Sequence, residues 1–64
     1  MSNNKLLEIY LDNCNAMYKR TGDGLHVIST PEDDYYYNTF EDMISDIKYT
    51  ISQWKLENIE INTL

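Results

Sequence analysis

Apolar side chains recur at intervals of three and four residues along the first third of the chain, which is the spacing of one helical face. This stripe comprises Leu6, Leu7, Tyr10, Leu11, Cys14, Met17 and Tyr18. The opposite side of the same helix would carry Glu8, Asp12, Asn15 and Lys19. The pattern predicts an amphipathic helix over about residues 4–20.

The ends of this helix have signals of their own. Ser2, Asn3 or Asn4 can supply the N-cap, because their side chains accept hydrogen bonds from the first free backbone N–H groups. Gly22, within "TGDG", suits the left-handed position that commonly follows a helix. We therefore expect the first helix to continue almost to this glycine.

A β-hairpin is expected over residues 25–37. "LHVIST" is short and rich in β-branched residues, "PEDD" is typical of a turn, and "YYYNT" provides the returning strand. Strand alternation places Tyr35 and Tyr37 on one face of the hairpin and Tyr36 on the other. A lone hairpin is unstable in water, so it must pack against the helices.

A second helix is expected over residues 39–55. Asn38 with Glu41, or Thr39 with Asp42, has the spacing of a capping box at its start. A narrow apolar stripe follows, made of Phe40, Met43, Ile44, Ile47, Ile51 and Trp54.

The tail, residues 56–64, is ambiguous. Ile59 and Ile61 alternate with Glu60, which is a weak signal for a third strand over residues 58–62, although a frayed end or a helix extension fits equally well. The predicted order is α-β-β-α. We expect a single α+β domain in which two amphipathic helices pack on a short antiparallel hairpin.

The distribution of charged residues along the chain limits the kinds of partner that the protein can bind. The formal net charge is −6, from eleven acidic and five basic residues, and residues 23–46 hold seven acids without one Lys or Arg. Such a surface repels the phosphates of nucleic acids and anionic lipids, so we expect no direct contact with nucleic acid or membrane. The polar start lacks the apolar core of a secretory signal, and no apolar run approaches the roughly 20 residues that span a bilayer.

Cys14 is the single cysteine, so no disulfide can form within the chain. That is typical of a reducing compartment, and we expect a cytoplasmic protein. A chain of 64 residues buries only about 60% of the surface that its unfolded form exposes. This small core favours stability gained from a partner or from a homodimer.

Chemistry-bearing residues are few. His26 and Cys14 are single, so the usual nitrogen and sulfur zinc sites cannot form within one chain. "DGLHVISTPEDD" lacks the ligand pattern of a calcium loop, and no phosphate-binding loop is present. We expect no enzyme activity, no metal and no cofactor. An enzyme or metal protein using Cys14, His26 and carboxylates remains the less favoured alternative.

The stretch "PEDDYYYNTFED", residues 31–42, combines five acids with four aromatic rings. Turn chemistry, strand propensity and helix capping explain each residue locally. They do not explain the missing Lys and Arg, because protein surfaces usually mix both signs of charge. We predict a surface that binds a basic groove on a larger, nucleic-acid-handling protein, with acids imitating phosphates and tyrosines supplying contact area. The predicted partner-binding residues are Glu32, Asp33, Asp34, Tyr35, Tyr36, Tyr37, Glu41, Asp42 and Asp46.

In size, acidity and lack of catalytic residues, the chain resembles small inhibitory proteins of phages and mobile elements. These include anti-restriction and anti-CRISPR proteins that occupy nucleic-acid sites. Acidic antitoxins and small sporulation or replication regulators share the same composition. The resemblance covers composition alone, and it implies a binding or inhibitory role.

A homo-oligomeric accessory domain is the main alternative. The helix stripes would then pair across a two-fold axis, and the acids would serve only solubility. Apolar residues of the tail would lie in the interface, namely Leu56, Ile59, Ile61 and Leu64.

Overall fold

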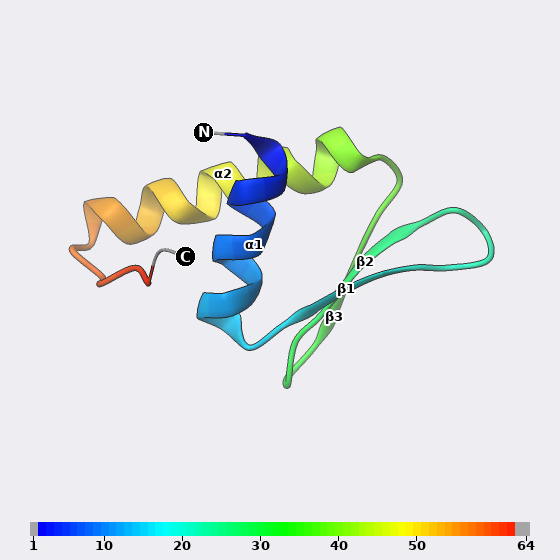
Figure 1. Ribbon diagram of the computed structural model, residues 1–64, viewed down its shortest axis with the longest axis horizontal. Coiled ribbons are helices and arrows are strands. Elements are labelled where there is room, and N and C mark those ends of the chain that lie inside the picture. The colour runs from blue at the N-terminus through cyan, green and yellow to red at the C-terminus, as the bar shows by residue number, and fades with distance from the viewer. Residues whose placement is uncertain (1, 63–64) are drawn as a thin grey trace.

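The computed structural model describes residues 2–62, which form one small α+β domain. Two helices pack with a three-stranded antiparallel sheet in the order α-β-β-β-α (Figure 1). The elements are α1 (Asn3–Cys14), β1 (Met17–Arg20), β2 (His26–Ser29), β3 (Asp34–Tyr37) and α2 (Phe40–Leu56). The predicted α+β class is therefore confirmed, with one strand more than the predicted hairpin. No helix within residues 2–62 is long and apolar enough to cross a membrane.

The first helix is shorter than predicted. It ends at Cys14 because Asn15 takes the left-handed conformation, with φ of 52°. The Ala16 N–H then donates to the Leu11 carbonyl at 2.9 Å, which closes the helix in a Schellman motif. Gly22 has no part in this ending; it lies in the connection between β1 and β2. The predicted helix over residues 4–20 is therefore wrong beyond Cys14.

The residues expected to finish that helix form β1 instead. Tyr18 pairs with Ile28 and Lys19 pairs with Val27, in antiparallel register with β2. Tyr18 packs against the core while Lys19 is exposed, which is the alternation of a strand. Pairing with β2 thus overrides a local spacing that also fits a helix.

The predicted hairpin is present as β2 and β3. Tyr37 pairs with His26, Tyr36 with Val27, and Tyr35 with Ile28. β2 is the central strand, so it is bonded on both sides and its residues His26, Val27 and Ile28 are all buried. The helices supply the packing that the sheet needs, because Ile28 lies in one core cluster with residues of α1 and α2.

The second helix begins close to its predicted start. Thr39 is the N-cap, and its hydroxyl accepts a hydrogen bond of 3.0 Å from the Asp42 N–H. Glu41 and Asp42 lie in the first turn, where negative charge interacts favourably with the helix dipole.

The core lies between the helices and one face of the sheet. Its buried members are Leu7, Ile9, Ile28, Met43, Ile44, Ile47 and Ile51. Ile9 is only 3% exposed although it falls outside the predicted stripe. Ile9 lies one helical turn before Asn13, so the two side chains are neighbours on the surface of α1. The C-terminal tail docks against Asn13.

The tail forms no strand within residues 58–62, contrary to the weak signal for one. Asn58 takes the left-handed conformation and ends α2 as Asn15 ends α1, with the Ile59 N–H bonded to the Trp54 carbonyl at 2.9 Å. The chain then returns to α1 (Figure 1). There the Asn13 side chain donates to the Asn62 carbonyl at 2.9 Å and accepts from the Asn62 N–H at 3.0 Å.

Candidate functional site

The turn between β2 and β3 is held by the side chain of Thr30. Its hydroxyl accepts from the N–H groups of Asp33 at 2.9 Å and Glu32 at 3.3 Å, and donates to the Asp33 carbonyl at 2.7 Å. The Thr30 N–H donates to the same carbonyl at 2.8 Å. Glu32 and Asp33 are both exposed. Their charges are therefore carried on an ordered turn rather than on a loose loop.

The three consecutive tyrosines divide between the two faces of the sheet, as predicted. Tyr37 packs against the core, and Tyr35 lies on the same face beside residues of α1. Tyr36 lies on the outer face and is 58% exposed. Asp34 shares this outer face, where it accepts a hydrogen bond of 2.7 Å from the Ser29 hydroxyl.

Tyr37 joins β3 to the second helix. Its hydroxyl donates a hydrogen bond of 2.5 Å to Oδ2 of Asp46. Burial raises the pKa of Tyr37 well above its ordinary value, because it disfavours the charged phenolate. The Asp46 carboxylate raises the pKa further, because it accepts the phenolic proton in a hydrogen bond and repels a second negative charge.

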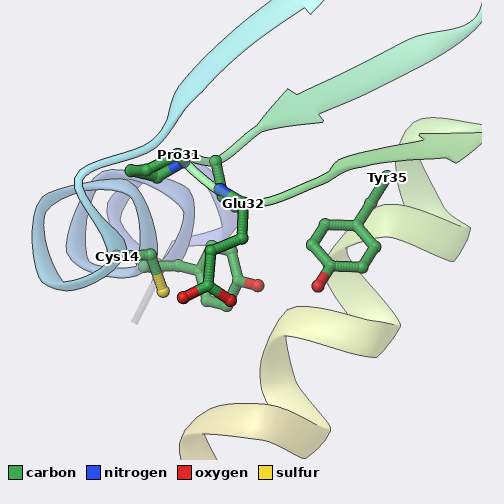
Figure 2. A pocket seen from close by; sticks show the side chains of 6 residues that line it. Cys14, Pro31, Glu32 and Tyr35 are labelled. Carbon is green, nitrogen blue, oxygen red and sulfur yellow. The ribbon is translucent and has the colours of Figure 1, made fainter.

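A surface groove of about 320 Å³ opens between the start of β3 and α1. It is lined by Tyr10, Cys14, Thr30, Pro31, Glu32 and Tyr35, and we call it the tyrosine groove. Figure 2 shows the Glu32 carboxylate reaching from the turn toward Cys14, with the Tyr35 ring on the other side. The groove thus combines two aromatic walls with one carboxylate.

Tyr10 forms the α1 side of this groove. Its ring is stacked on Trp54 of α2, with centroids 5.8 Å apart and planes 4° from parallel. Burial raises its pKa to about 12, and the nearby Cys14, Tyr35 and Asp46 side chains add to the shift. Burial likewise raises the pKa of the Cys14 thiol, which favours the neutral form. Tyr10 and Cys14, the two α1 residues of the groove, are therefore uncharged at neutral pH.

The nine residues predicted to bind a partner do not form one face. Glu32 and Tyr35 lie in the tyrosine groove. Asp46 is close enough to Tyr10, another lining residue, to contribute to its raised pKa. Tyr37 is half-buried between β3 and α2, while Asp34 and Tyr36 face outward from the sheet.

Two of the nine residues are farther away. Glu41 and Asp42 begin α2, at the end of β3 opposite the turn that carries Glu32 and Asp33 (Figure 1). β3 extends over about 10 Å between Asp34 and Tyr37, so two acidic ends flank one edge strand. None of the seven acids between residues 23 and 46 forms a salt bridge within residues 2–62.

Four of the six residues that line the groove are not among the predicted partner-binding residues, namely Tyr10, Cys14, Thr30 and Pro31. Tyr10 and Cys14 lie in the apolar stripe of the first helix, which is the ordinary signal for core residues. Thr30 and Pro31 fit the predicted strand end and turn. No pattern in the sequence distinguishes these positions, because the groove depends on how α1 and the hairpin are placed in the fold.

His26 and Cys14 belong to different surroundings. His26 is 8% exposed, and its Nδ1 is 2.7 Å from the Tyr18 hydroxyl. Its ring also makes an edge contact with Phe40 at 5.9 Å between centroids. Cys14 instead lies in the tyrosine groove. Within residues 2–62 there is no group of three or more His, Cys, Asp or Glu side chains that could hold a metal ion.

Comparison with protein-family models, with curated proteins and with solved structures finds no match to this chain.

Proposed function

We propose that this protein is a non-enzymatic binding protein that modulates or inhibits a larger partner. The partner handles nucleic acid, and the protein occupies its basic groove in the manner of small inhibitors from phages and mobile elements. The acids take the place of phosphates, and the tyrosines supply contact area.

The observation that carries the proposal is the set of unpaired acids along β3 and at both of its ends. Glu32 and Asp33 are exposed on an ordered turn, and Glu41 and Asp42 are exposed at the start of α2. A charge that already has an internal partner contributes little to attracting another protein. These carboxylates have no Lys or Arg partner within residues 2–62, so their field extends into solvent.

Exposed tyrosines add contact area to this field. Tyr35 is 45% exposed and Tyr36 is 58% exposed, on opposite faces of the same edge strand. Tyrosine rings lose little conformational entropy on binding and bring a polar tip, which is why interfaces are enriched in them. The acids would raise the association rate, and the rings would slow dissociation.

The test is affinity capture from native lysate of the source cells, read by quantitative mass spectrometry. Wild type is compared with an Asp33→Asn, Asp34→Asn variant, in which the side-chain carbonyl introduced at the second position can still accept the bond from Ser29. The matched control is Glu57→Gln, Glu60→Gln, which removes the same charge from exposed positions that follow α2.

The proposal expects one near-stoichiometric protein that is captured by wild type and by the control but lost with the turn variant. Its electrostatic surface should contain a basic groove for nucleic acid. Identical captured sets for all three proteins, or none for any of them, would contradict the proposal.

A homo-oligomeric accessory domain is the second candidate. Leu56, the last residue of α2, is 76% exposed, and Ile59, three residues later, is 48% exposed. Ile61 does not favour this candidate because it packs against the core, and Leu64 lies outside the described residues. Light scattering over a range of concentrations tests it: a monomer at low micromolar concentration would dispose of this candidate.

A further inference from the structure

We propose that the tyrosine groove is a binding site for the guanidinium group of an arginine side chain. The arginine is presented by the partner protein, so the inference rests on the proposed function and names the residue type that the surface recognises. The occupant is an arginine rather than a phosphate, a metal ion or an apolar side chain.

The walls of the groove suit a flat cation. Tyr10 from α1 and Tyr35 from β3 both line it, and the π-system of an aromatic ring attracts a positive charge to its face. A volume of about 320 Å³ is sufficient for one long side chain. An anion would instead meet two electron-rich rings and a carboxylate, which disfavours phosphate.

Glu32 supplies the charge that complements the cation. Its carboxylate reaches over the groove from the turn, next to Cys14 (Figure 2). It forms no salt bridge or side-chain hydrogen bond within residues 2–62, so both oxygens can accept from a guanidinium fork. Asp46 adds negative potential from the α2 side, because it is close enough to influence Tyr10.

No Lys or Arg within residues 2–62 forms a salt bridge with Glu32. Between Arg20 and Lys48 the chain contains neither Lys nor Arg, and the six lining residues include none. Burial raises the pKa of the Cys14 thiol and so favours its neutral form, which neither repels nor replaces the incoming group. Charge complementarity therefore has to come from another molecule.

The groove is ordered before any ligand arrives. Stacking on Trp54 fixes the Tyr10 ring, and the bonds of Thr30 fix the backbone that carries Glu32. The bond from Tyr37 to Asp46 holds β3, and with it Tyr35, against α2. Such ordering reduces the conformational entropy that binding would otherwise cost.

Arginine fits these features better than lysine does. A guanidinium is planar, stacks on aromatic rings and meets a carboxylate with two parallel hydrogen bonds. An ammonium group is more strongly hydrated and cannot make the paired contact. We expect a Kd on the order of 1 mM for a single blocked arginine, and a weaker one for lysine.

The test is a titration of the 15N-labelled protein with N-acetyl-arginine amide, followed by amide chemical shifts. N-acetyl-citrulline amide is the matched control ligand, since citrulline has nearly the same shape without the charge. The expected result is saturable shifts centred on residues 10–14 and 30–35, with citrulline and N-acetyl-lysine amide binding at least about threefold more weakly.

Two variants locate the site. Glu32→Gln should weaken arginine binding by about threefold to tenfold, whereas Asp33→Asn, one residue along the same turn and outside the groove, should leave it within about twofold. Tyr35→Leu should weaken it as well. Equal binding of citrulline and arginine, equal effects of the two turn variants, or shifts centred elsewhere would each overturn the inference.

The two proposals fail separately. A partner whose capture depends on Asp33 and Asp34 but is unaffected by Glu32→Gln would overturn the arginine site and leave the proposed function standing. Saturable arginine binding with no dependence of capture on the turn acids would support the arginine site and contradict the wider acidic surface.

Discussion

The hydrogen bond from the Tyr37 hydroxyl to Asp46 joins the last residue of β3 to the second turn of α2 at a distance of 2.5 Å. One predicted partner-binding acid is therefore also a structural residue. It fixes the edge strand whose Tyr35 forms a wall of the tyrosine groove. Changes at Asp46 would affect both stability and the surface, so the free acids of the turn are the better sites for testing binding.

Loss of this bond should weaken the fold measurably. We expect Tyr37→Phe to lower the free energy of unfolding by about 1 kcal/mol, because one hydrogen bond to a partly exposed carboxylate is lost. Urea denaturation measures the change. In a double-mutant cycle with Asp46→Asn, the two losses should be non-additive. Strict additivity would show that the two side chains do not interact in solution.

Alkaline pH should destabilise the protein over a definite range. The pKa of Tyr10 is raised to about 12 and that of Tyr37 is raised further, both from an ordinary value of 10.0. The folded state therefore holds these protons more tightly than the unfolded state does. Their stabilising contribution is complete below pH 10 and is lost as pH rises toward 12 and beyond.

Denaturant unfolding at a series of pH values measures this loss. Tyr37→Phe should reduce the slope above pH 10, because one of the shifted groups is removed. Tyr49→Phe is the matched control, since that ring is 65% exposed, and it should leave the slope unchanged. Equal slopes for wild type and Tyr37→Phe would contradict the assigned role of Tyr37.

The end of α1 depends on the left-handed backbone of Asn15. Asn15→Ala should lower the free energy of unfolding by about 1 kcal/mol, because a Cβ without the amide disfavours this conformation. Asn15→Gly should raise it by about 0.5 kcal/mol. The matched control is Asn4→Ala in the exposed part of α1, which should be neutral or stabilising. A loss on Asn4→Ala as large as at Asn15 would contradict this explanation.

The tail should detach when Asn13 is truncated. Its side chain holds the backbone of Asn62 from both sides and also donates to the Ile9 carbonyl at 2.7 Å. Asn13→Ala should accelerate hydrogen exchange at the Asn62 amide by about fivefold or more, equivalent to about 1 kcal/mol of local stability. Exchange at the Ile28 amide in the central strand serves as the internal reference. An unchanged rate at Asn62 would contradict the docking.

Sequence reasoning succeeded where local and tertiary preferences agree. The stripe from Phe40 to Trp54 fits one helical face only, and Thr39 marks its start, so α2 was predictable. Sequence reasoning failed at β1, because Met17 and Tyr18 fit the stripe of a helix as well as they fit a strand. The deciding feature is Asn15, which resembles an ordinary polar helix residue until its left-handed conformation is seen.

The candidate site was predictable only in part. The acids and tyrosines of residues 31–42 stand out by composition, and alternation correctly separated Tyr36 from Tyr35 and Tyr37. The groove itself was not predictable, because Tyr10 precedes Pro31 by more than twenty residues in the sequence. Tyr10 reaches the groove because α1 and β3 both pack against α2.

The most direct measurement is the association rate constant with the captured partner, determined at increasing salt concentration. The proposed function predicts a rate that falls steeply with salt. At low salt, Asp33→Asn, Asp34→Asn should slow association by roughly threefold to tenfold, while Glu57→Gln, Glu60→Gln should have little effect. A rate that is insensitive to salt, and equal for both variants, would contradict the claim that the acids along β3 and at its ends form the binding surface.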